Sequence, residues 1–416
     1  MASVTGANAE TIHRANLGAL VRRVHSEGAT SRSDLVAETG LSRSAVRTLV
    51  SELVALGLVY ESPPTSGGNP GRPSQLVHPK PDGAVVLAMD VAVDSLAVAT
   101  VGLGGHVFDH VRIDRPRGRL SPEETVSDLA DLAAAAMSRP PAPDRLVGIG
   151  VAVVGIVRSA DGLVHFAPNL DWHDVPLADL IRDALDTTLP IRVGNEADLG
   201  ALAEHIRGAA VGVDDLLYVS GEVGIGGGAI IDGRPLSGSL GYGGEIGHMV
   251  VNPLGLPCRC GSQGCWETEV GEAAILRWAG VREPATGRAA VEAVLHAAAD
   301  GDPTSLRALE SVGRWLALGI GNLANFLNPR LVILGGLLAH VHPFVADAVQ
   351  AEVARRALPV VGQNLRIVRS ELGTEASLLG AAELAFTQGL ADPSLLQPAS
   401  QRSQGTPAGD QERSVR

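Results

Sequence analysis

The chain has 416 residues, 45% of them hydrophobic, which is enough for two or three packed domains rather than one small core. Its 33 lysines and arginines against 46 aspartates and glutamates give a net charge of −13, which argues against a surface that binds nucleic acid throughout. No apolar run reaches the roughly 20 residues that cross a bilayer, and no signal-like leader opens the chain, so we expect a cytoplasmic protein with no membrane partner.

The N-terminal block differs in charge from the remainder of the chain. Residues 1–80 hold eight basic and six acidic side chains, so this block has two surplus positive charges and the other residues carry −15. Residues 1–11 are small and polar without periodicity, and we expect them to be disordered. The remainder of the block, residues 12–80, is a candidate for a domain with its own partner.

Apolar residues at helical spacing predict three helices in this block. Their expected ranges are 16–28, 31–40 and 43–56. Ser31 or Ser33 can cap the second helix and Ser42 the third, because a serine oxygen accepts hydrogen bonds from the free amides of a first turn. A tight turn at residues 39–41 joins these two helices, and the pattern is that of a helix-turn-helix.

Two short strands and the loop between them complete the pattern of a winged helix. The strands are expected at 58–61 and 75–77, with a loop rich in glycine, proline and serine between them. Arg72 lies between prolines in this loop, and an extended arginine suits insertion into a narrow minor groove. The alternative for this loop is an ordinary linker.

The third helix opens with side chains that could reach base edges and phosphates in the major groove of double-stranded DNA. The residues predicted to contact DNA are Arg32, Ser42, Arg43, Ser44, Arg47, Thr48 and Arg72. The alternative is a winged helix that mediates dimerisation or binds another protein. We favour DNA because these positions are polar and basic rather than apolar.

Beyond a boundary at residues 80–83 the pattern changes to strands and helices of an α/β domain. Strands are expected at 84–91, 95–103, 106–113 and 146–154, and a helix at 125–137. This order resembles the ribonuclease H-like half of the actin, hexokinase and Hsp70 ATPase architecture. A second half is expected from about Asp215, and the polar residues 389–416 are expected to form a disordered tail.

All three cysteines of the chain, Cys258, Cys260 and Cys265, lie within eight residues of one another, and His248 precedes them. One imidazole and three thiolates form a tetrahedral ligand set for Zn²⁺, and four protein ligands indicate a structural rather than a catalytic ion. The alternatives are three unrelated buried cysteines or a disulfide, which the odd number of cysteines disfavours.

Two glutamates flank the cysteine cluster. Glu245 precedes His248 by three residues, and Glu267 follows Cys265 by two. A loop folded around an ion would bring both carboxylates close to the imidazole, and this is a good acceptor set for sugar hydroxyls. The alternative is that both glutamates only support the metal ligands.

The pattern E-x-G-H followed by C-x-C-G-x-x-G-C-x-E resembles the signature of the ROK family, which comprises repressors, open reading frames and sugar kinases. The resemblance extends over residues 12–388. It implies a structural Zn²⁺ on the histidine and the three cysteines, and a sugar site in the same region. The implied sugar-binding residues are Asn169, Asn195, Glu196, Glu245, His248 and Glu267. For Asn169 the alternative is a plain turn residue.

The resemblance also implies the fold class. A winged helix-turn-helix at 12–80 is followed by a two-lobed, actin/hexokinase/Hsp70-like ROK domain at 84–388. The N-terminal winged helix-turn-helix, which we call the reader, is similar to the DNA-binding domain of ROK repressors. ROK sugar kinases lack this domain.

The positions that resemble the kinase phosphate site depart from the family pattern. The turn D-x-G-x-T reads Asp90 to Asp94 here, without the glycine or the threonine, and the turn G-T-G-x-G-G-G begins with Glu222. Two like charges at about 4 Å repel by roughly 4 kcal/mol at an effective dielectric of 20, so we expect Asp94 and Glu222 to exclude phosphate. The catalytic base position reads Glu196, and the longer side chain displaces its oxygen by about an ångström. We therefore expect no catalytic residue and no phosphoryl transfer.

These observations predict a sugar-responsive transcriptional regulator, a repressor of carbohydrate metabolism genes. Its expected partners are a double-stranded DNA operator, a small-molecule sugar effector and further copies of itself, as a homodimer or a dimer of dimers. Closure of the cleft around sugar would change the spacing of the two readers. The alternatives are an ATP-dependent kinase of a hexose or amino sugar that also carries a DNA reader, and a sugar-sensing scaffold without DNA affinity.

Overall fold

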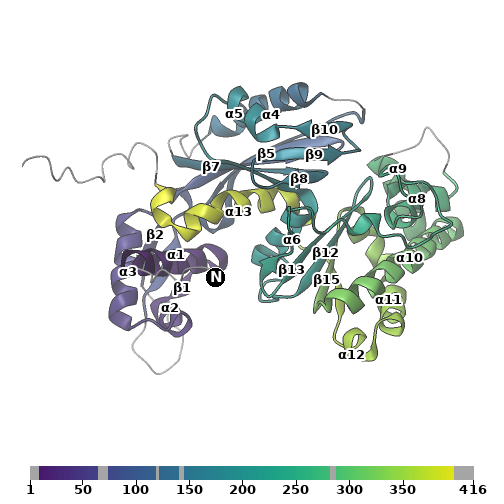
Figure 1. Cartoon of the computed structure of the whole chain (residues 1–416). Helices are drawn as coiled ribbons and strands as arrows, with labels where there is room; N and C mark the ends of the chain where they lie inside the picture. The colour runs from purple at the N-terminus through teal and green to yellow at the C-terminus, as the bar shows by residue number, and fades with distance from the viewer. Residues whose placement is uncertain (1–8, 64–73, 119–120, 140–144, 282–286, 398–416) are drawn as a thin grey trace, which may run out of the picture.

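The computed structural model describes residues 9–63, 74–118, 121–139, 145–281 and 287–397. Figure 1 shows an N-terminal reader, a first lobe that contains β4 to β11, and a second lobe that contains β12 to β16. In this view the first lobe is at the top, the reader lies below it on the left, and the second lobe lies below it on the right. Within the described residues, no helix is long and apolar enough to cross a membrane.

The reader is a winged helix-turn-helix. Its elements are α1 (Ala9–Glu27), β1 (Thr30–Ser31), α2 (Arg32–Thr39), α3 (Arg43–Ala55), β2 (Val59–Ser62) and β3 (Leu76–Pro79). The three strands form an antiparallel sheet in the order β1-β3-β2. Ser31 caps α2 by accepting from the amide of Asp34, and Ser42 caps α3 by accepting from that of Ala45. Gly40 ends α2 in the left-handed conformation, which a residue without Cβ adopts at no steric cost.

The first helix starts earlier than the apolar pattern predicts. It begins at Ala9, within the residues that we expected to be disordered. Polar contacts hold this segment in place: His13 Nε2 lies 2.9 Å from Glu52 of α3, and Arg14 lies 3.0 Å from Glu10 and 3.3 Å from Asp392. Hydrophobic periodicity cannot reveal ion pairs with residues far away in the chain. Residues 1–8 lie outside the described residues.

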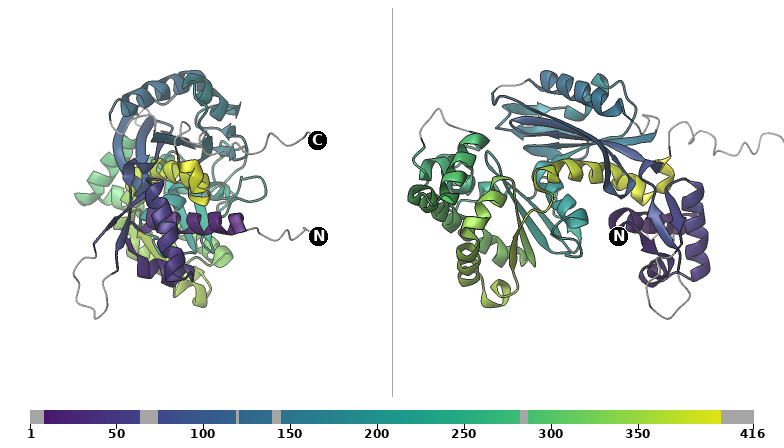
Figure 2. Two further views of the ribbon diagram at one scale, coloured as in Figure 1. Left: turned by 90° about the vertical axis from the view of Figure 1, so that its left-hand side faces the viewer. Right: turned by 180° about the vertical axis from the view of Figure 1, so that it is seen from behind.

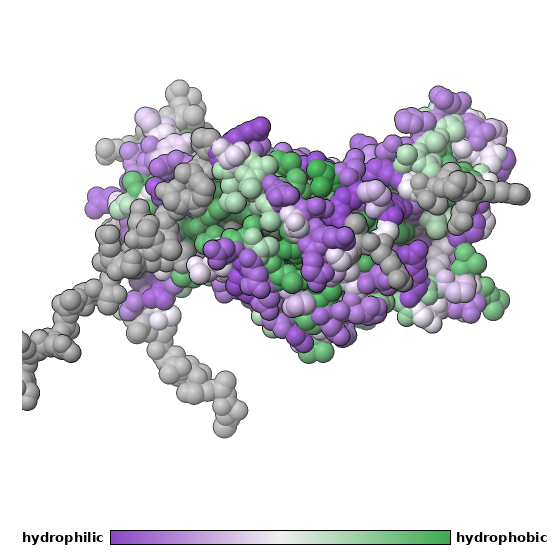
Figure 3. Space-filling view, turned by 90° about the horizontal axis from the view of Figure 1, so that it is seen from above, coloured by the Kyte–Doolittle hydropathy of each residue, from purple (hydrophilic) through white to green (hydrophobic). Residues whose placement is uncertain are grey.

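The first lobe is built on a sheet of five strands in the order β11-β7-β4-β5-β6. Its elements are η1 (Pro81–Gly83), β4 (Val85–Val91), β5 (Ser95–Gly102), η2 (Leu103–Gly105), β6 (His106–Asp114), α4 (Pro122–Met137), β7 (Leu146–Val153), α5 (Leu177–Ala184) and β11 (Ile191–Asn195). A small sheet of β8 (Ile156–Arg158), β9 (Leu163–Ala167) and β10 (Trp172–Val175) follows β7. Seen from above, polar and apolar side chains are interspersed over this lobe (Figure 3).

The second lobe repeats this topology with a sheet in the order β14-β13-β12-β15-β16. Its strands are β12 (Leu216–Gly221), β13 (Ile225–Ile231), β14 (Arg234–Pro235), β15 (Leu331–Gly335) and β16 (Arg366–Arg369). Its helices are η4 (Ile246–His248), α7 (Glu267–Val270), α8 (Glu272–Trp278), α9 (Arg288–Ala299), α10 (Pro303–Leu327), α11 (Gly336–Arg356), α12 (Pro359–Gly362) and η5 (Gly373–Glu375). In each lobe three antiparallel strands are extended by two parallel ones, which confirms the predicted two-lobed fold.

Two helices join the lobes. α13 (Ala376–Ala391) packs on β4 and β7 of the first lobe, and α6 (Glu196–Arg207) packs on β12 and β13 of the second. The two helices also pack on each other, so closely that a Cβ at Gly380 of α13 would lie 2.0 Å from the Leu199 carbonyl oxygen of α6. They therefore form the shared wall between the lobes, as Figures 1 and 2 show.

The chain is ordered beyond the expected start of the tail at residue 389. α13 continues to Ala391, and η6 (Pro393–Leu396) follows it. Leu390 and Leu396 are buried in the same core as Leu17 and Leu20 of α1, so the reader itself holds this segment in place. Residues 398–416, the remainder of the predicted tail, lie outside the described residues.

Candidate functional site

The four predicted metal ligands come together. His248, Cys258, Cys260 and Cys265 offer ligand atoms that all lie within 4.8 Å of one another. Cys260 Sγ and Cys265 Sγ are 3.7 Å apart, and so are Cys258 Sγ and His248 Nδ1. In a tetrahedral Zn²⁺ site with Zn–S bonds near 2.3 Å, neighbouring sulfurs are about 3.8 Å apart. The donor set and its spacing therefore fit a four-coordinate metal ion.

The loop that carries the cysteines is folded by close backbone contacts. The amides of Val251 and Asn252 both donate to the carbonyl oxygen of Gly264. Gly264 has a φ of +75°, and a Cβ there would lie 1.7 Å from the Asn252 carbonyl oxygen. A glycine is therefore required next to Cys265, and it holds this thiol close to Cys260.

The thiol of Cys258 is held in its protonated form by its surroundings. Burial raises the pKa of Cys258, and the hydrogen bond that its Sγ donates to Glu267 Oε1 at 2.8 Å raises it further. A bound ion has to displace this proton, because the thiolate is the ligand. His248 turns Nδ1 towards Cys258, and its Nε2 lies 3.8 Å from Glu245 Oε2. The imidazole therefore connects the metal cluster to the neighbouring cleft.

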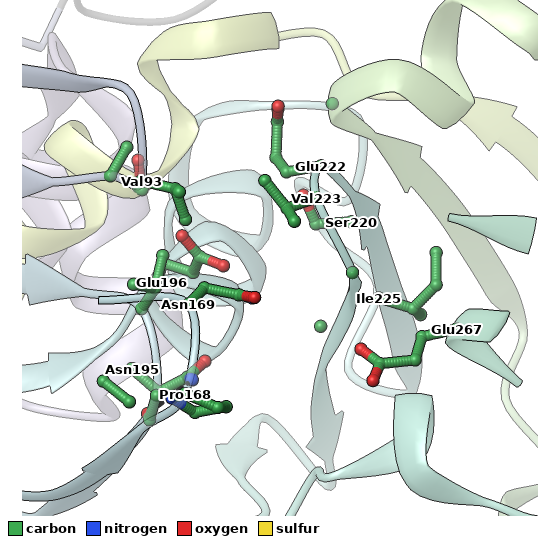
Figure 4. Close-up of a pocket in the computed structure, with 18 of the residues that line it drawn as sticks. Val93, Pro168, Asn169, Asn195, Glu196, Ser220, Glu222, Val223, Ile225 and Glu267 are labelled. Atoms are coloured by element: carbon green, nitrogen blue, oxygen red, sulfur yellow. Dashed lines mark hydrogen bonds between the residues drawn. The ribbon is translucent and has the colours of Figure 1, made fainter. Parts of the chain in front are cut away.

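A cleft with an empty volume of about 1300 Å³, its open mouth included, lies between the two lobes. All six residues predicted to bind sugar line it: Asn169, Asn195, Glu196, Glu245, His248 and Glu267. In Figure 4, Asn169, Asn195 and Glu196 face the cleft from the first-lobe side, and Glu267 faces it from the opposite wall. The structure therefore brings residues that are up to 98 positions apart into one site.

Asn195 and Glu196 lie where β11 ends and α6 begins. The Asn195 Oδ1 caps α6 by accepting from the amides of Ala197 and Asp198, and its Nδ2 donates to the Gly155 carbonyl oxygen at 2.9 Å. These three bonds engage the Asn195 side chain inside the protein. Asn195 therefore caps the helix that begins with Glu196, and sequence reasoning did not identify this capping role.

Asn169 is held by the cysteine loop of the other lobe. Its Oδ1 accepts from Arg259 Nη1 at 3.1 Å, and Arg259 lies between Cys258 and Cys260. Sequence reasoning did not select Arg259, although its place between two metal ligands was a usable signal. The contact links the predicted metal centre to the opposite wall of the cleft.

The expected charge repulsion on the phosphate side is wrong, because both carboxylates have arginine partners. Arg117 lies 2.9 Å from Asp94 and forms two bonds, of 2.7 and 2.8 Å, with Glu272 of the second lobe. Arg288 lies 3.1 Å from Glu222. The charges on this side of the cleft are therefore paired: Arg117 joins the two lobes, and Arg288 pairs with Glu222 within the second lobe. No local sequence signal identifies Arg117 or Arg288.

Carboxyl groups in the cleft bind their protons tightly. Burial raises the pKa of Glu196 well above its ordinary value, and the nearby carboxylates of Asp90 and Glu222 raise it further. Burial likewise raises the pKa of Glu222 to about 7, against the opposing effect of Arg288, and raises that of Glu245. A protonated carboxyl both donates and accepts hydrogen bonds, so these groups can bind neutral hydroxyls.

The start of α3 presents two arginines to solvent. Arg43 and Arg47 are exposed, and neither guanidinium forms a hydrogen bond or ion pair with the side chain of another described residue. The neighbouring hydroxyls are partly engaged: Ser42 caps the helix and bonds Ser44 at 3.0 Å, and Thr48 donates to the Ser44 carbonyl oxygen. The free cations of this surface are therefore the arginines.

Arg32 does not belong to this exposed surface. It begins α2, and its Nη2 lies 2.6 Å from Glu61 Oε2 of β2, partly buried. The pair fastens the helix to the wing strand, so we assign Arg32 a structural role. Arg72 lies outside the described residues.

Comparison with known proteins places these features in a family. The sequence profile of the ROK family matches residues 86–388. The chain belongs to the ROK family. A xylose repressor of Bacillus spizizenii is 32% identical over 378 residues, which cover 90% of this chain and 95% of that protein.

Solved structures separate the regulators of the family from the kinases by coverage. A ROK transcriptional regulator homologous to the E. coli MLC protein superposes with a TM-score of 0.76 at 27% identity, over 94% of this chain and 100% of that one. A ROK glucokinase of Streptomyces griseus, solved with glucose and AMPPNP, has a TM-score of 0.64 at 27% identity, over 73% of this chain and 100% of that one. This ROK protein therefore shares nearly its full length, reader included, with regulators.

Proposed function

We propose that this ROK protein is a sugar-responsive transcriptional repressor and not an enzyme. The cleft would bind the sugar and the reader would bind a double-stranded DNA operator. The observation that carries the proposal is the asymmetry of the cleft. Asn169, Glu196, Glu245, His248 and Glu267 offer hydrogen-bonding groups on one side, while on the other side Arg117 and Arg288 form ion pairs where a kinase would need free phosphate-binding groups. The similarity to xylose repressors over 90% of the chain supports it.

Glu196, Glu245, His248 and Glu267 would form the core of the sugar site, with Asn169 at its rim. D-xylose is the first candidate effector, because xylose repressors are among the relatives, and D-glucose is the second. In both sugars each hydroxyl can donate and accept, which matches the carboxyl groups of Glu196 and Glu245, whose pKa burial raises.

The proposal is tested by calorimetric titration of the full chain with D-xylose and D-glucose, and by measuring ATP consumption with the same sugars. We expect heat of binding from one sugar and no consumption of ATP above the rate without protein. Duplexes selected from a random DNA library should bind the same preparation, with an affinity that the sugar changes. Sugar-dependent ATP turnover would show a kinase instead, and absence of DNA binding would leave a sugar-sensing scaffold.

We further propose that His248, Cys258, Cys260 and Cys265 hold one Zn²⁺ per chain. The ion would fix the loop that carries Arg259 and orient His248 and Glu267 at the edge of the cleft. Cys258→Ser should lower the zinc content from about one ion per chain to a small fraction and lower the melting temperature. Ser262→Ala in the same loop is the control and should keep the metal. Equal zinc content in the two variants would contradict the site.

Two readers on one operator require two copies of the chain, so we propose a homodimer. Dimeric helix-turn-helix proteins place their recognition helices about 34 Å apart, one turn of DNA. Light scattering of the full chain should give about twice the mass of 42.8 kDa. We retain the division into a reader at 12–80 and a ROK domain at 84–388 as part of this proposal.

A further inference from the structure

Helix α6 runs from the cleft to the neighbourhood of the reader. Its first residue is Glu196, which lines the cleft, and its last is Arg207. Twelve residues of α-helix span about 18 Å, and a helix of this length moves as a rigid rod. Because α6 packs both on β12 and β13 of the second lobe and on α13 of the first, a movement of one lobe relative to the other acts on this helix and on Arg207 at its end.

The companion helix α13 runs between the same two places. Ser377 in its first turn lines the cleft, and its C-terminal end packs under α1 of the reader. At that end a Cβ on Gly18 of α1 would lie 2.6 Å from the Ala391 carbonyl oxygen. In the views of Figure 2, α13 lies along the first lobe and reaches the reader. The reader is therefore seated on α13, which belongs to the first lobe.

A buried polar cluster connects the end of α6 to this seat. It consists of His25 of α1, Glu383 of α13 and Arg207 of α6, with side chains that are 1%, 3% and 13% exposed. Arg207 Nε donates to Glu383 Oε1 at 2.6 Å, and His25 Nε2 lies 2.9 Å from Glu383 Oε2. The Glu383 carboxylate thus binds both His25 of the reader and Arg207 of α6, the helix that packs on the second lobe.

The backbone and Arg207 add further contacts around His25. The Gly104 amide donates to His25 Nδ1 at 3.0 Å, and Arg207 Nη2 lies 2.7 Å from His25 Nε2. Arg207 Nη1 donates to the carbonyl oxygens of Gly104 at 2.9 Å and of His25 at 3.3 Å, and Nη2 reaches the His25 carbonyl oxygen at 3.4 Å. The guanidinium therefore holds the backbone of both the reader and the first lobe.

The charges in this cluster cannot separate without cost. Burial raises the pKa of Glu383, but His25 and Arg207 together lower it to about 2, so the carboxylate stays ionised. A buried charge that loses its partner is strongly destabilising, so displacement of Arg207 has to be followed by His25 and Glu383 or relieved by a new arrangement. The side chains of such a buried cluster adopt a few discrete arrangements and do not shift gradually from one to another. This property suits a conformational switch.

We propose that Arg207 is a positioning residue that transmits the state of the cleft to the reader. A ligand that engages Glu196 and closes the lobes shifts α6, and Arg207 passes this shift to α1 through His25 and Glu383. The inference rests on the proposed function, since it requires that the cleft binds a sugar and that the reader binds DNA. It assigns the coupling to one side chain that contacts neither ligand.

An exposed ion pair across the same interface provides a matched control. Arg14 of α1 lies 3.3 Å from Asp392, just beyond the end of α13, and its side chain is 51% exposed. This pair also joins the reader to the region of α13, but it has no connection to α6. Removing it should affect the seating of the reader slightly and the transmission from the cleft not at all.

The test compares the full-length wild type with Arg207→Gln, Arg207→Lys and Arg14→Gln. Sugar affinity is measured by calorimetry with D-xylose and D-glucose, and hydrogen exchange of α1 and α3 is measured with and without saturating sugar. DNA affinity is measured on a selected duplex in both conditions. The ratio of the two DNA affinities defines the coupling, which is about 5- to 150-fold in typical allosteric proteins.

We expect Arg207→Gln to bind sugar and, without sugar, DNA within about twofold of the wild type, while its coupling falls to about one. The sugar-dependent change in exchange of α1 should disappear with it. Arg207→Lys keeps the charge but loses the forked geometry, so it should restore only part of the coupling. Arg14→Gln should behave as the wild type does.

Wild-type coupling in Arg207→Gln would overturn the inference, and so would sugar binding to the wild type without any change in exchange of α1. A wild type that binds neither sugar is a different result, since it refutes the proposed function itself. If Arg207→Gln melts well below the wild type, Arg207→Lys is compared with Arg14→Gln in its place. Equal coupling between sugar and DNA binding in these two variants would refute transmission through Arg207.

Discussion

Asp90 carries a buried carboxyl group whose ionisation does not stabilise the fold. It ends the first β-strand of the ROK domain, is 5% exposed, and its Oδ1 has no hydrogen-bond partner among the described residues. Burial raises its pKa to about 6, although the Ser377 hydroxyl and Arg112 oppose the shift. Its side chain lines the cleft between the lobes.

Because the pKa of Asp90 is raised, we predict that its contribution to the free energy of unfolding depends on pH. The folded-state pKa lies above the ordinary value of 3.8, so ionisation disfavours the folded state above pH 6 and has no effect below about pH 4. A shift of this size corresponds to roughly 3 kcal/mol. Asp90→Asn should therefore raise the free energy of unfolding at pH 8, with a gain that shrinks towards pH 4. Urea unfolding measures it, with the exposed Asp82→Asn as control. A gain that is independent of pH would contradict the assigned cause.

At the scale of elements, the turn after β4 is joined to helix α8 by Arg117. The guanidinium binds Asp94 on its own lobe and Glu272 on the other, and the side chain of Glu272 is only 6% exposed. The amide of Gly287 also donates to Glu272 Oε1 at 2.8 Å. The connection therefore holds four segments of the two lobes together.

Loss of this connection should be costly. Arg117→Gln leaves Glu272 buried without its cation, and we expect a loss of about 2–3 kcal/mol in the free energy of unfolding, below the value for fully buried pairs because Arg117 is 28% exposed. Arg158→Gln removes the exposed pair with Asp161 and should leave the free energy of unfolding nearly unchanged. Similar losses in the two variants would show that the inter-lobe pair is no stronger than a surface pair.

The recognition helix allows a test that separates contact with DNA from support of the reader. Arg43→Ala or Arg47→Ala removes an exposed cation and should weaken DNA binding by about 1–3 kcal/mol without changing the melting temperature. Arg32→Gln breaks the pair with Glu61 and should lower the melting temperature, while the salt dependence of DNA binding stays that of the wild type. The salt dependence follows from fluorescence anisotropy at several salt concentrations. If the DNA affinity of Arg32→Gln depends less steeply on salt concentration than that of the wild type, Arg32 contacts DNA as the sequence predicted.

At the scale of the whole molecule, the reader and the first lobe share one hydrophobic core. Leu20 and Leu53 of the reader belong to the same buried cluster as Val86 and Phe386 of the ROK domain. The Phe386 ring lies 4.9 Å from the His25 ring. A domain whose core is continuous with its neighbour does not unfold independently of it.

We therefore expect one thermal transition for the reader and the first lobe together. Phe386→Ala should destabilise both by about 3–5 kcal/mol, because it leaves a cavity in the shared core. Calorimetry gives the number of transitions, and hydrogen exchange reports which helices lose protection. Phe326→Ala is the control, since that side chain is 83% exposed. Early melting of α1 to α3, with the first lobe intact, would contradict a shared core.

Local patterns were sufficient for much of this protein. The three helices of the reader, the cysteine cluster and four strands of the first lobe follow from spacing, because their determinants are neighbours in the chain. Helix at Ala9 and helical structure beyond residue 389 were not predicted, because these segments rest on contacts with distant residues, such as Arg14 with Asp392.

The sequence by itself determined which chemical groups are available: the donor set for a metal, the carboxyls for a sugar, and the arginines for DNA. Only the tertiary structure decided how those groups are paired. It gave Asp94 and Glu222 their arginines, committed Arg32 to Glu61, and brought His25, Arg207 and Glu383 together. The physical reason is that ion pairs depend on distance and burial, and residues 358 positions apart acquire both only when the chain folds.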